Sequence, residues 1–295
     1  MSNESEAVEI IRLSETPRVS VVIPSFSKSR EDNLQALIED LKGQTVKDLE
    51  ILVVRGVSPQ GKAINQGVRK IRGEILAVVD DDSRIGHSKV LENLVRALEK
   101  DSRVAMAGAS ILPPPNATPF QKKAAEQFPR FRMPIVEKVT DSDLPCHGCV
   151  VFRKEIFLKV GMEREDILRG LDPDLRVRIR QAGYRVVLVP DTWAYHPLPD
   201  GVLKFVRVFL RNGYGSAYAQ VFRPDISYDT DENVSSGGFV PMTPFFFRLL
   251  RFPLRLVKSF LSGQWIRFLG YSVYAFGYLA GYLRFAFWER MRGKV

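Results

Sequence analysis

Short runs of apolar residues alternate along the chain with segments in which apolar residues recur at helical spacing. The first run, Val19–Ile23, is closed by Pro24, and it is followed by apolar residues placed on one helix face at Leu34, Leu37, Ile38 and Leu41. The pattern recurs, with apolar runs at 49–54, 75–79 and 104–109 and candidate helices at 61–72 and 90–99. Near-continuous apolar strands separated by helices are typical of a sheet covered by helices on both faces. The pattern predicts an α/β fold with a mixed, mostly parallel sheet.

The second half of the chain is less regular. Between Leu112 and Leu144 the periodicity weakens, and we expect a variable loop region over the sheet. Regular spacing returns with further elements, namely strands at 150–152 and 185–189 and helices at 154–159, 173–182 and 201–220. We therefore predict four parts: a flexible N-terminus at 1–17, an α/β domain at 18–222, a polar, glycine-rich linker at 223–244 and a helical tail at 245–295.

Charge is distributed unevenly. The formal net charge is +9, and nearly all of the excess lies in residues 241–295, where nine basic residues accompany one acidic residue. Phenylalanines alternate with basic residues in 245–260, which is the composition of an interfacial helix. The uncharged stretch Phe268–Leu283 is short of the roughly 20 residues that a membrane span needs, so we expect it to lie in the bilayer, dip into it or span it once. The tail favours an anionic membrane surface as partner and argues against nucleic acid.

The first residues and the cysteines bear on the compartment. The polar, acidic opening lacks the basic start and apolar run of an export signal, so we expect the protein on the cytoplasmic face of the cell membrane. Cys146 and Cys149 allow at most one disulfide, which excludes a disulfide framework. Zinc binding by the pair is disfavoured because no second pair completes a tetrahedral site.

Three consecutive aspartates, Asp80, Asp81 and Asp82, follow the third apolar run. Like charges at contact distance repel, and a divalent cation would remove the cost. Carboxylate oxygens suit Mg²⁺ or Mn²⁺, and ligands bind at the carboxyl ends of strands in open α/β sheets. An acidic turn that caps the next helix is the alternative interpretation of the same residues.

The surroundings of this cluster resemble family 2 glycosyltransferases of the GT-A fold, in particular membrane-associated prokaryotic members. The matching segments are 21–26, 63–67 with 73–75, and 80–82. The resemblance implies a Rossmann-like catalytic domain with a nucleotide-sugar half at 18–110 and an acceptor half at 111–222. It also implies metal binding by Asp82 and contacts to a nucleoside-diphosphate sugar by Pro24, Ser25, Asn65, Asp80 and, more weakly, Asp81. Arg55 stands where the family usually has an aspartate that contacts the base; it could contact the donor or have no ligand role.

The acceptor half resembles the same family through Leu171-Asp-Pro-Asp-Leu175, Gln181-Ala-Gly-Tyr184 and Val189-Pro-Asp191, followed by His196. The resemblance implies that Asp172 is the general base of an inverting transfer, although Asp-Pro-Asp is also a good helix start. Asp174 is the alternative carboxylate and a candidate acceptor contact. His196 could complete the metal site or be structural, and Gly148 with His147 would lie beside the acceptor.

The resemblance thus implies a hexosyltransferase that uses Mn²⁺ or Mg²⁺ and a lipid-linked or glycan acceptor at the membrane. Two other functions stay open. A sugar nucleotidyltransferase would carry a glycine-rich loop after the first strand, and Ser25–Arg30 contains no glycine. A catalytically inactive scaffold with the same fold is conceivable because Arg55 and Leu171 depart from the family pattern.

Overall fold

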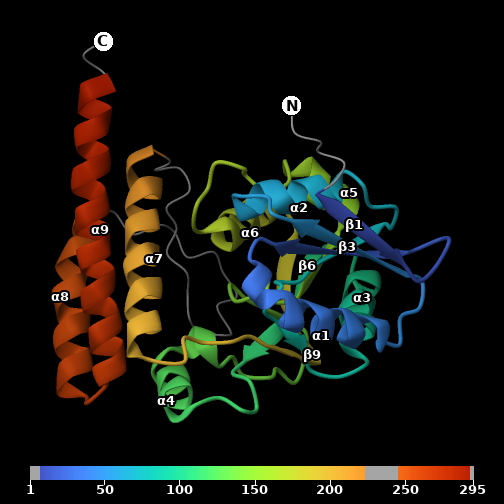
Figure 1. Cartoon of the computed structure of the whole chain (residues 1–295), viewed down its shortest axis with the longest axis horizontal. Coiled ribbons are helices and arrows are strands. Elements are labelled where there is room, and N and C mark those ends of the chain that lie inside the picture. The colour runs from blue at the N-terminus through green and yellow to red at the C-terminus, as the bar shows by residue number, and fades with distance from the viewer. Residues whose placement is uncertain (1–6, 223–244, 293–295) are drawn as a thin grey trace.

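The computed structural model describes residues 7–222 and 245–292. The predicted linker at 223–244 lies outside these residues. An α/β body and a group of long helices stand side by side in the molecule (Figure 1).

A single mixed sheet forms the centre of the body. Its order is β1-β3-β2-β4-β8-β6-β9-β5, with β7 paired to β9. The strands are β1 (Val8–Arg12), β2 (Val19–Ser25), β3 (Leu49–Arg55), β4 (Ile75–Val78), β5 (Arg84–Ile85), β6 (Val104–Leu112), β7 (Thr140–Asp141), β8 (Val150–Arg153) and β9 (Arg185–Tyr195). The pairs β2–β3, β2–β4 and β6–β9 are parallel, whereas β8 runs antiparallel between β4 and β6. The predicted mixed α/β sheet is confirmed, but it is not mostly parallel: among the described residues three strand pairs are parallel and five are antiparallel.

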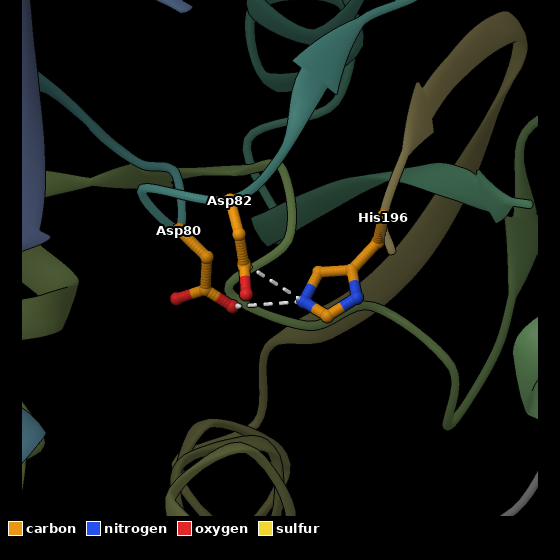
Figure 2. A group of neighbouring side chains, drawn as sticks. All are labelled: Asp80, Asp82 and His196. Atoms are coloured by element: carbon orange, nitrogen blue, oxygen red, sulfur yellow. Dashed lines mark ion pairs between the residues drawn. The ribbon is translucent and has the colours of Figure 1, made fainter. Parts of the chain in front are cut away.

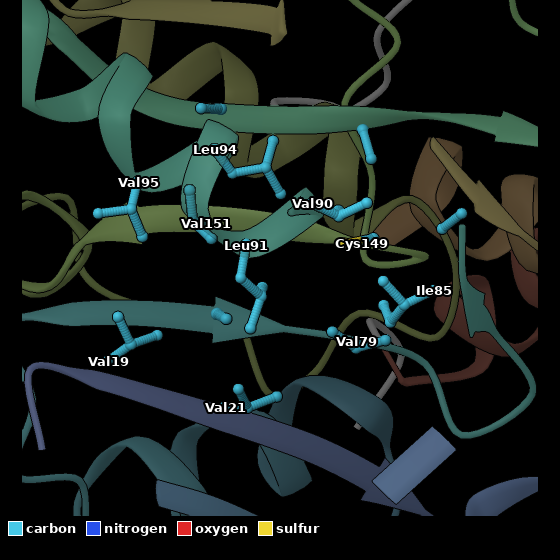
Figure 3. Close-up of a cluster of buried hydrophobic side chains, with 14 of the residues drawn as sticks. Val19, Val21, Val79, Ile85, Val90, Leu91, Leu94, Val95, Cys149 and Val151 are labelled. Carbon is cyan, nitrogen blue, oxygen red and sulfur yellow. The ribbon is translucent and has the colours of Figure 1, made fainter. Parts of the chain in front are cut away.

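Helices cover both faces of this sheet. On one face lie α1 (Glu31–Lys42) and α3 (Val90–Lys100); on the other lie α2 (Gln60–Val68), α5 (Lys154–Lys159) and α6 (Leu171–Gln181) (Figure 1). Alternate strand residues point to opposite faces, so Val21 packs with the first pair of helices and Val22 with the second set. Figure 3 shows Val19 and Val21 beside Leu91, Leu94 and Val95 of α3 in the first core.

Two segments differ from the sequence expectation. Residues 8–12, which we expected to be flexible, form edge strand β1 in antiparallel register with β3. The strand is only half-buried, so its apolar signal is weak. Within the expected loop region, α4 (Pro119–Gln127) begins at a capping box in which the Thr118 hydroxyl accepts from the Gln121 N–H and the Gln121 side chain accepts from the Thr118 N–H.

The last helix of the predicted domain 18–222 packs against a helix of the predicted tail. Helix α7 (Val202–Phe222) packs along α9 (Trp265–Arg292), and α8 (Phe245–Leu261) packs on α9; we call these three helices the helical unit (Figure 1). Backbones approach closely at glycines, since a Cβ on Gly213 would clash with the Tyr274 carbonyl and one on Gly277 with the Leu210 carbonyl. The aromatic residues Phe128, Phe205 and Phe209 join this unit to α4. In the parts of the chain that the structure describes, no helix combines the length and the apolar character required to cross a bilayer.

Candidate functional site

The three aspartates form a turn directly after β4, which we call the acidic turn (Asp80–Asp82). The chain of β9 ends beside this turn because the last residues of β9 pair with β5, just beyond it. His196 follows β9, and its Nε2 lies 3.2 Å from Asp82 Oδ1 and 3.9 Å from Asp80 Oδ2 (Figure 2). The side chains of Asp80, Asp82 and His196 offer ligand atoms that all lie within 4.8 Å of one another. We call this group the carboxylate–histidine cluster.

The electrostatics of the cluster favour a cation. Burial and then the charge of Asp82 raise the pKa of Asp80 to about 6. Burial opposes ionisation of Asp82, but His196 and Arg30 outweigh this effect and lower its pKa. Burial would likewise lower the pKa of His196, yet Asp82 and then Asp80 raise it to about 9.

The donor atoms of the cluster fit a divalent metal ion. Asp82 Oδ1 is buried, makes no hydrogen bond among the described residues and lies 3.2 Å from His196 Nε2, so it is available as a ligand atom once the His196 ring has lost its proton. Two carboxylates and an imidazole are a ligand set that suits Mn²⁺ and tolerates Mg²⁺. The structure thus brings Asp80, Asp82 and His196 together as a candidate metal centre.

Asp81, between the two cluster aspartates, has a different environment. Its side chain is buried and Oδ1 accepts from Arg30 Nη1 at 2.6 Å, while its carbonyl accepts from the Asn33 side chain at 2.7 Å. The expected weak donor contact is therefore replaced by an internal ion pair that holds the acidic turn against the start of α1.

Asp172 lies in the first turn of α6, after Gly170, whose φ of 94° reverses the chain. Its Oδ1 accepts the backbone N–H of His147 at 2.8 Å. Burial would raise the pKa of Asp172, but the charges of His147 and Arg176 outweigh it and lower the pKa. Because the His147 carbonyl accepts the Asp80 N–H at 2.9 Å, the backbone of this one residue connects the acidic turn with Asp172. A carboxylate able to accept a proton therefore lies next to the candidate metal centre.

His147 is buried rather than exposed to an acceptor. Its Nε2 lies 2.9 Å from Glu163 Oε1 and its Nδ1 lies 3.3 Å from Asp172 Oδ1. Burial would lower its pKa, but Asp172 and Glu163 raise it to about 10, so the ring is charged at neutral pH. The expected acceptor contact is corrected to a positioning role behind Asp172. Sequence reasoning missed Glu163, and no local motif marks it.

The other two acceptor-side residues are also internal. Asp174 is fully buried, with Oδ2 2.7 Å from Arg178 Nη2 and Oδ1 3.4 Å from Arg164 Nε. An added Cβ on Gly148 would lie 2.7 Å from Ile111 Cδ1, so this glycine serves packing. Both residues thus have internal partners, and their acceptor contacts stay predictions.

The donor-side residues occupy the edge formed by β2, β3 and α2. Pro24 and Ser25 end β2, and the Ser25 carbonyl accepts the Gly56 N–H at 2.8 Å. Arg55 is paired with Glu31 at 2.7 Å and with Glu9 of β1 at 3.0 Å. Asn65 is buried; its amide donates to the Glu163 carbonyl at 2.8 Å and its Oδ1 accepts the Glu163 N–H at 3.0 Å. Asn65 thereby links α2 to the Glu163 segment, and its donor contact stays a prediction.

With this geometry in view, comparison with known proteins is informative. The family model described as "glycosyltransferase like family 2" matches residues 6–215. The amylovoran biosynthesis glycosyltransferase AmsE of Erwinia amylovora is 24% identical over 206 residues, which cover 58% of this chain and 73% of that protein. A mannosyltransferase of Pyrobaculum calidifontis, PcManGT, solved in complex with GDP-Man and Mn²⁺, aligns with a TM-score of 0.56 at 16% identity over 91% of this chain and 88% of its own.

Proposed function

This chain belongs to glycosyltransferase family 2 and is a glycosyltransferase with a GT-A fold, and from this premise we propose that it transfers a sugar from a nucleoside-diphosphate sugar to a hydroxyl of a lipid-linked or glycan acceptor, with inversion, at a membrane surface. One observation carries the proposal: the backbone N–H and carbonyl of His147 hold the Asp172 carboxylate beside the carboxylate–histidine cluster. Two adjacent sites, one for a metal-bound donor and one for a proton, are what such a transfer requires.

In the proposed reaction the Asp172 carboxylate takes the proton of the acceptor hydroxyl. The acceptor oxygen forms a bond to the anomeric carbon while the bond from that carbon to the phosphate oxygen breaks, and the nucleoside diphosphate leaves with the electron pair. Attack from the face opposite the leaving group inverts the anomeric configuration. His147 and its partner Glu163 fix the position of Asp172.

Asp80, Asp82 and His196 would hold Mn²⁺ or Mg²⁺. The Mn²⁺ and GDP-Man in the Pyrobaculum mannosyltransferase support a divalent ion and a nucleotide-sugar donor for this chain. Bound there, the ion would offset the negative charge of the departing diphosphate. Arg55 is paired with Glu31 and Glu9, so it does not identify the nucleobase of the donor.

A thermal-shift panel of UDP, GDP, CDP and dTDP, each with and without Mn²⁺, tests the donor assignment. At least one nucleotide should raise the unfolding temperature more with Mn²⁺ than without it, because a ligand that binds only the folded state stabilises it. If no nucleotide shifts the wild-type protein under either condition, the inactive-scaffold interpretation is favoured instead.

Mn²⁺ affinity should increase with pH between 6.5 and 8.5, by up to about tenfold per unit. Since the pKa of His196 is about 9 without metal, its ring is protonated in this range and must lose a proton to bind the ion. The folding stability of the metal-free protein has the opposite pH dependence. The raised pKa of His196 contributes stability that is fully present below the unfolded pKa of about 6.5 and is lost as the pH rises through 9. Calorimetric titration with Mn²⁺ measures the slope, and a flat profile would exclude His196 as a ligand.

The proposed membrane partner is supported by the exposed face of α8. Its exposed apolar side chains follow one another at intervals of three and four residues, and they are Phe247, Leu250, Leu254, Val257 and Leu261. Exposed basic residues accompany them at Arg251, Arg255 and Lys258. An apolar helix face accompanied by cations fits the boundary of an anionic bilayer.

Leu254→Glu combined with Val257→Glu should abolish co-sedimentation with phosphatidylglycerol vesicles. The change adds two negative charges to the centre of the apolar face of α8 and leaves the α/β body untouched. Leu203→Glu is the matched control, because Leu203 is 76% exposed on α7. Equal vesicle binding by the α8 variant and the wild type would refute the membrane role of this face.

A further inference from the structure

One arginine near the site has no hydrogen-bond or ion-pair partner in the part of the chain that the structure describes. Arg169 lies in the turn that leads into α6, directly before Gly170 and three residues before Asp172. Its side chain is half-buried, and among residues 7–222 and 245–292 it makes no hydrogen bond or ion pair. Burial and then the charge of Arg211 lower its pKa to about 10, whereas Asp80 acts in the opposite direction. A partly buried guanidinium without an acceptor is costly, so a ligand is expected to supply the negative charge.

Helix α7 holds this arginine in place. A Cβ on Gly215 would lie 2.5 Å from Arg169 Cγ and 3.0 Å from its Cβ, so the stem of Arg169 lies directly on the α7 backbone. Arg211 precedes Gly215 by four residues, which places it on the same helix face. Figure 1 shows the segment before α6 on the side of the body that faces α7. Two cations, one from the body and one from the helical unit, are therefore close enough for their charges to interact, and the first of them, Arg169, also interacts with the charge of Asp80.

The charges of the carboxylate–histidine cluster indicate which ligand would need these two arginines. Ionised Asp80 and Asp82 would neutralise a divalent ion completely, and Arg30 is already paired with Asp81 and Asp82. A diphosphate bound to this ion would therefore keep most of its own negative charge. Guanidinium groups bind phosphate oxygens through charge-assisted, often bidentate hydrogen bonds.

We infer that Arg169 and Arg211 bind the diphosphate of the nucleotide donor, so that α7 completes the donor site from the side of the helical unit. The inference rests on the proposed function. It gives the helical unit a part in donor binding in addition to its proposed membrane contact.

The test compares Arg169→Met and Arg211→Gln with the wild-type full chain by isothermal titration calorimetry. Methionine keeps an apolar stem against Gly215 while it removes the charge. The probes are GDP and UDP with Mn²⁺, and inorganic pyrophosphate with Mg²⁺. Each variant should bind pyrophosphate and the preferred nucleotide roughly ten- to a hundredfold more weakly, the effect of one charged hydrogen-bond partner. Arg207→Gln, one turn earlier on α7, is the matched control and should bind like the wild type.

The possible outcomes separate this inference from the proposed function. A wild-type protein that binds neither nucleotide nor pyrophosphate refutes both. If the wild type binds and Arg169→Met stays within about twofold of it, the inference alone is overturned. It is also overturned if Arg169→Met leaves nucleotide affinity unchanged and raises only the KM for a phosphorylated acceptor, because the arginines then serve the acceptor. Unchanged thermal unfolding of Arg169→Met together with weaker binding supports it.

Discussion

Asp172→Asn should lower kcat for sugar transfer by about 10² to 10⁴, the usual contribution of a positioned general base. The asparagine oxygen can still accept the His147 N–H that Asp172 Oδ1 accepts at 2.8 Å, so the backbone around the site is retained. What the amide loses is the ability to take a proton from the acceptor hydroxyl. Initial rates with a nucleotide-sugar donor, measured together with nucleotide affinity, separate this loss from a loss of binding.

Asp174→Asn is the matched control on the same helix. Asp174 is fully buried between Arg164 and Arg178, so its substitution should lower the free energy of unfolding and leave kcat per folded molecule nearly unchanged. If Asp172→Asn retains a third or more of the wild-type kcat, Asp172 is not the base and the proposed mechanism fails.

Asp82→Asn should remove the Mn²⁺-dependent part of nucleotide binding. Asp82 supplies the buried Oδ1 that makes no hydrogen bond to any described residue and lies 3.2 Å from His196 Nε2. A metal–carboxylate interaction contributes several kcal/mol, which corresponds to roughly a hundredfold or more in Mn²⁺ affinity. Since Asp82 also pairs with Arg30, the informative quantity is the difference in unfolding temperature with and without Mn²⁺.

Asp81→Asn tests whether Mn²⁺ binding depends on Asp82 in particular or only on the total negative charge of the acidic turn. The Asp81 side chain is buried against Arg30, so this variant should be less stable and still respond to Mn²⁺. A variant pair in which Asp81→Asn loses the Mn²⁺ response and Asp82→Asn keeps it would reverse the assignment of ligands.

Much of the body could be predicted from local patterns. The β-branched runs at β2, β3 and β4 are buried on both faces, so they read as continuous apolar strands. The order of strands along the sequence also placed Asp80 and Asp82 after one strand and His196 after another. Residues that follow strands at the same edge of a sheet lie close together. The sequence assigns Asp82 and His196 to the metal and Asp80 to the nucleotide sugar, and the structure places all three side chains together; metal binding stays a prediction.

The donor and acceptor contacts were harder to predict because each depends on a partner distant in the chain. Asn65 hydrogen-bonds to Glu163, and His147 pairs with the same glutamate. Arg55 meets Glu9, a residue of an edge strand whose weak pattern was interpreted as a flexible terminus. The sequence predicts a loop where α4 forms, because this short helix lacks a clear apolar period.

By itself the sequence determined the alternation of strands and helices, the acidic turn and the basic, aromatic composition of the tail, because each of these follows from residues close together in the chain. The tertiary structure alone decided that His147 supports Asp172 instead of facing an acceptor, and that α7 packs on α9 through Gly213 and Gly277. It also decided that Arg169 faces α7 without a partner among the described residues. The physical reason is that a helix pattern specifies an apolar face but not what covers it, and a charge in the sequence carries no information about the distant residue that compensates it.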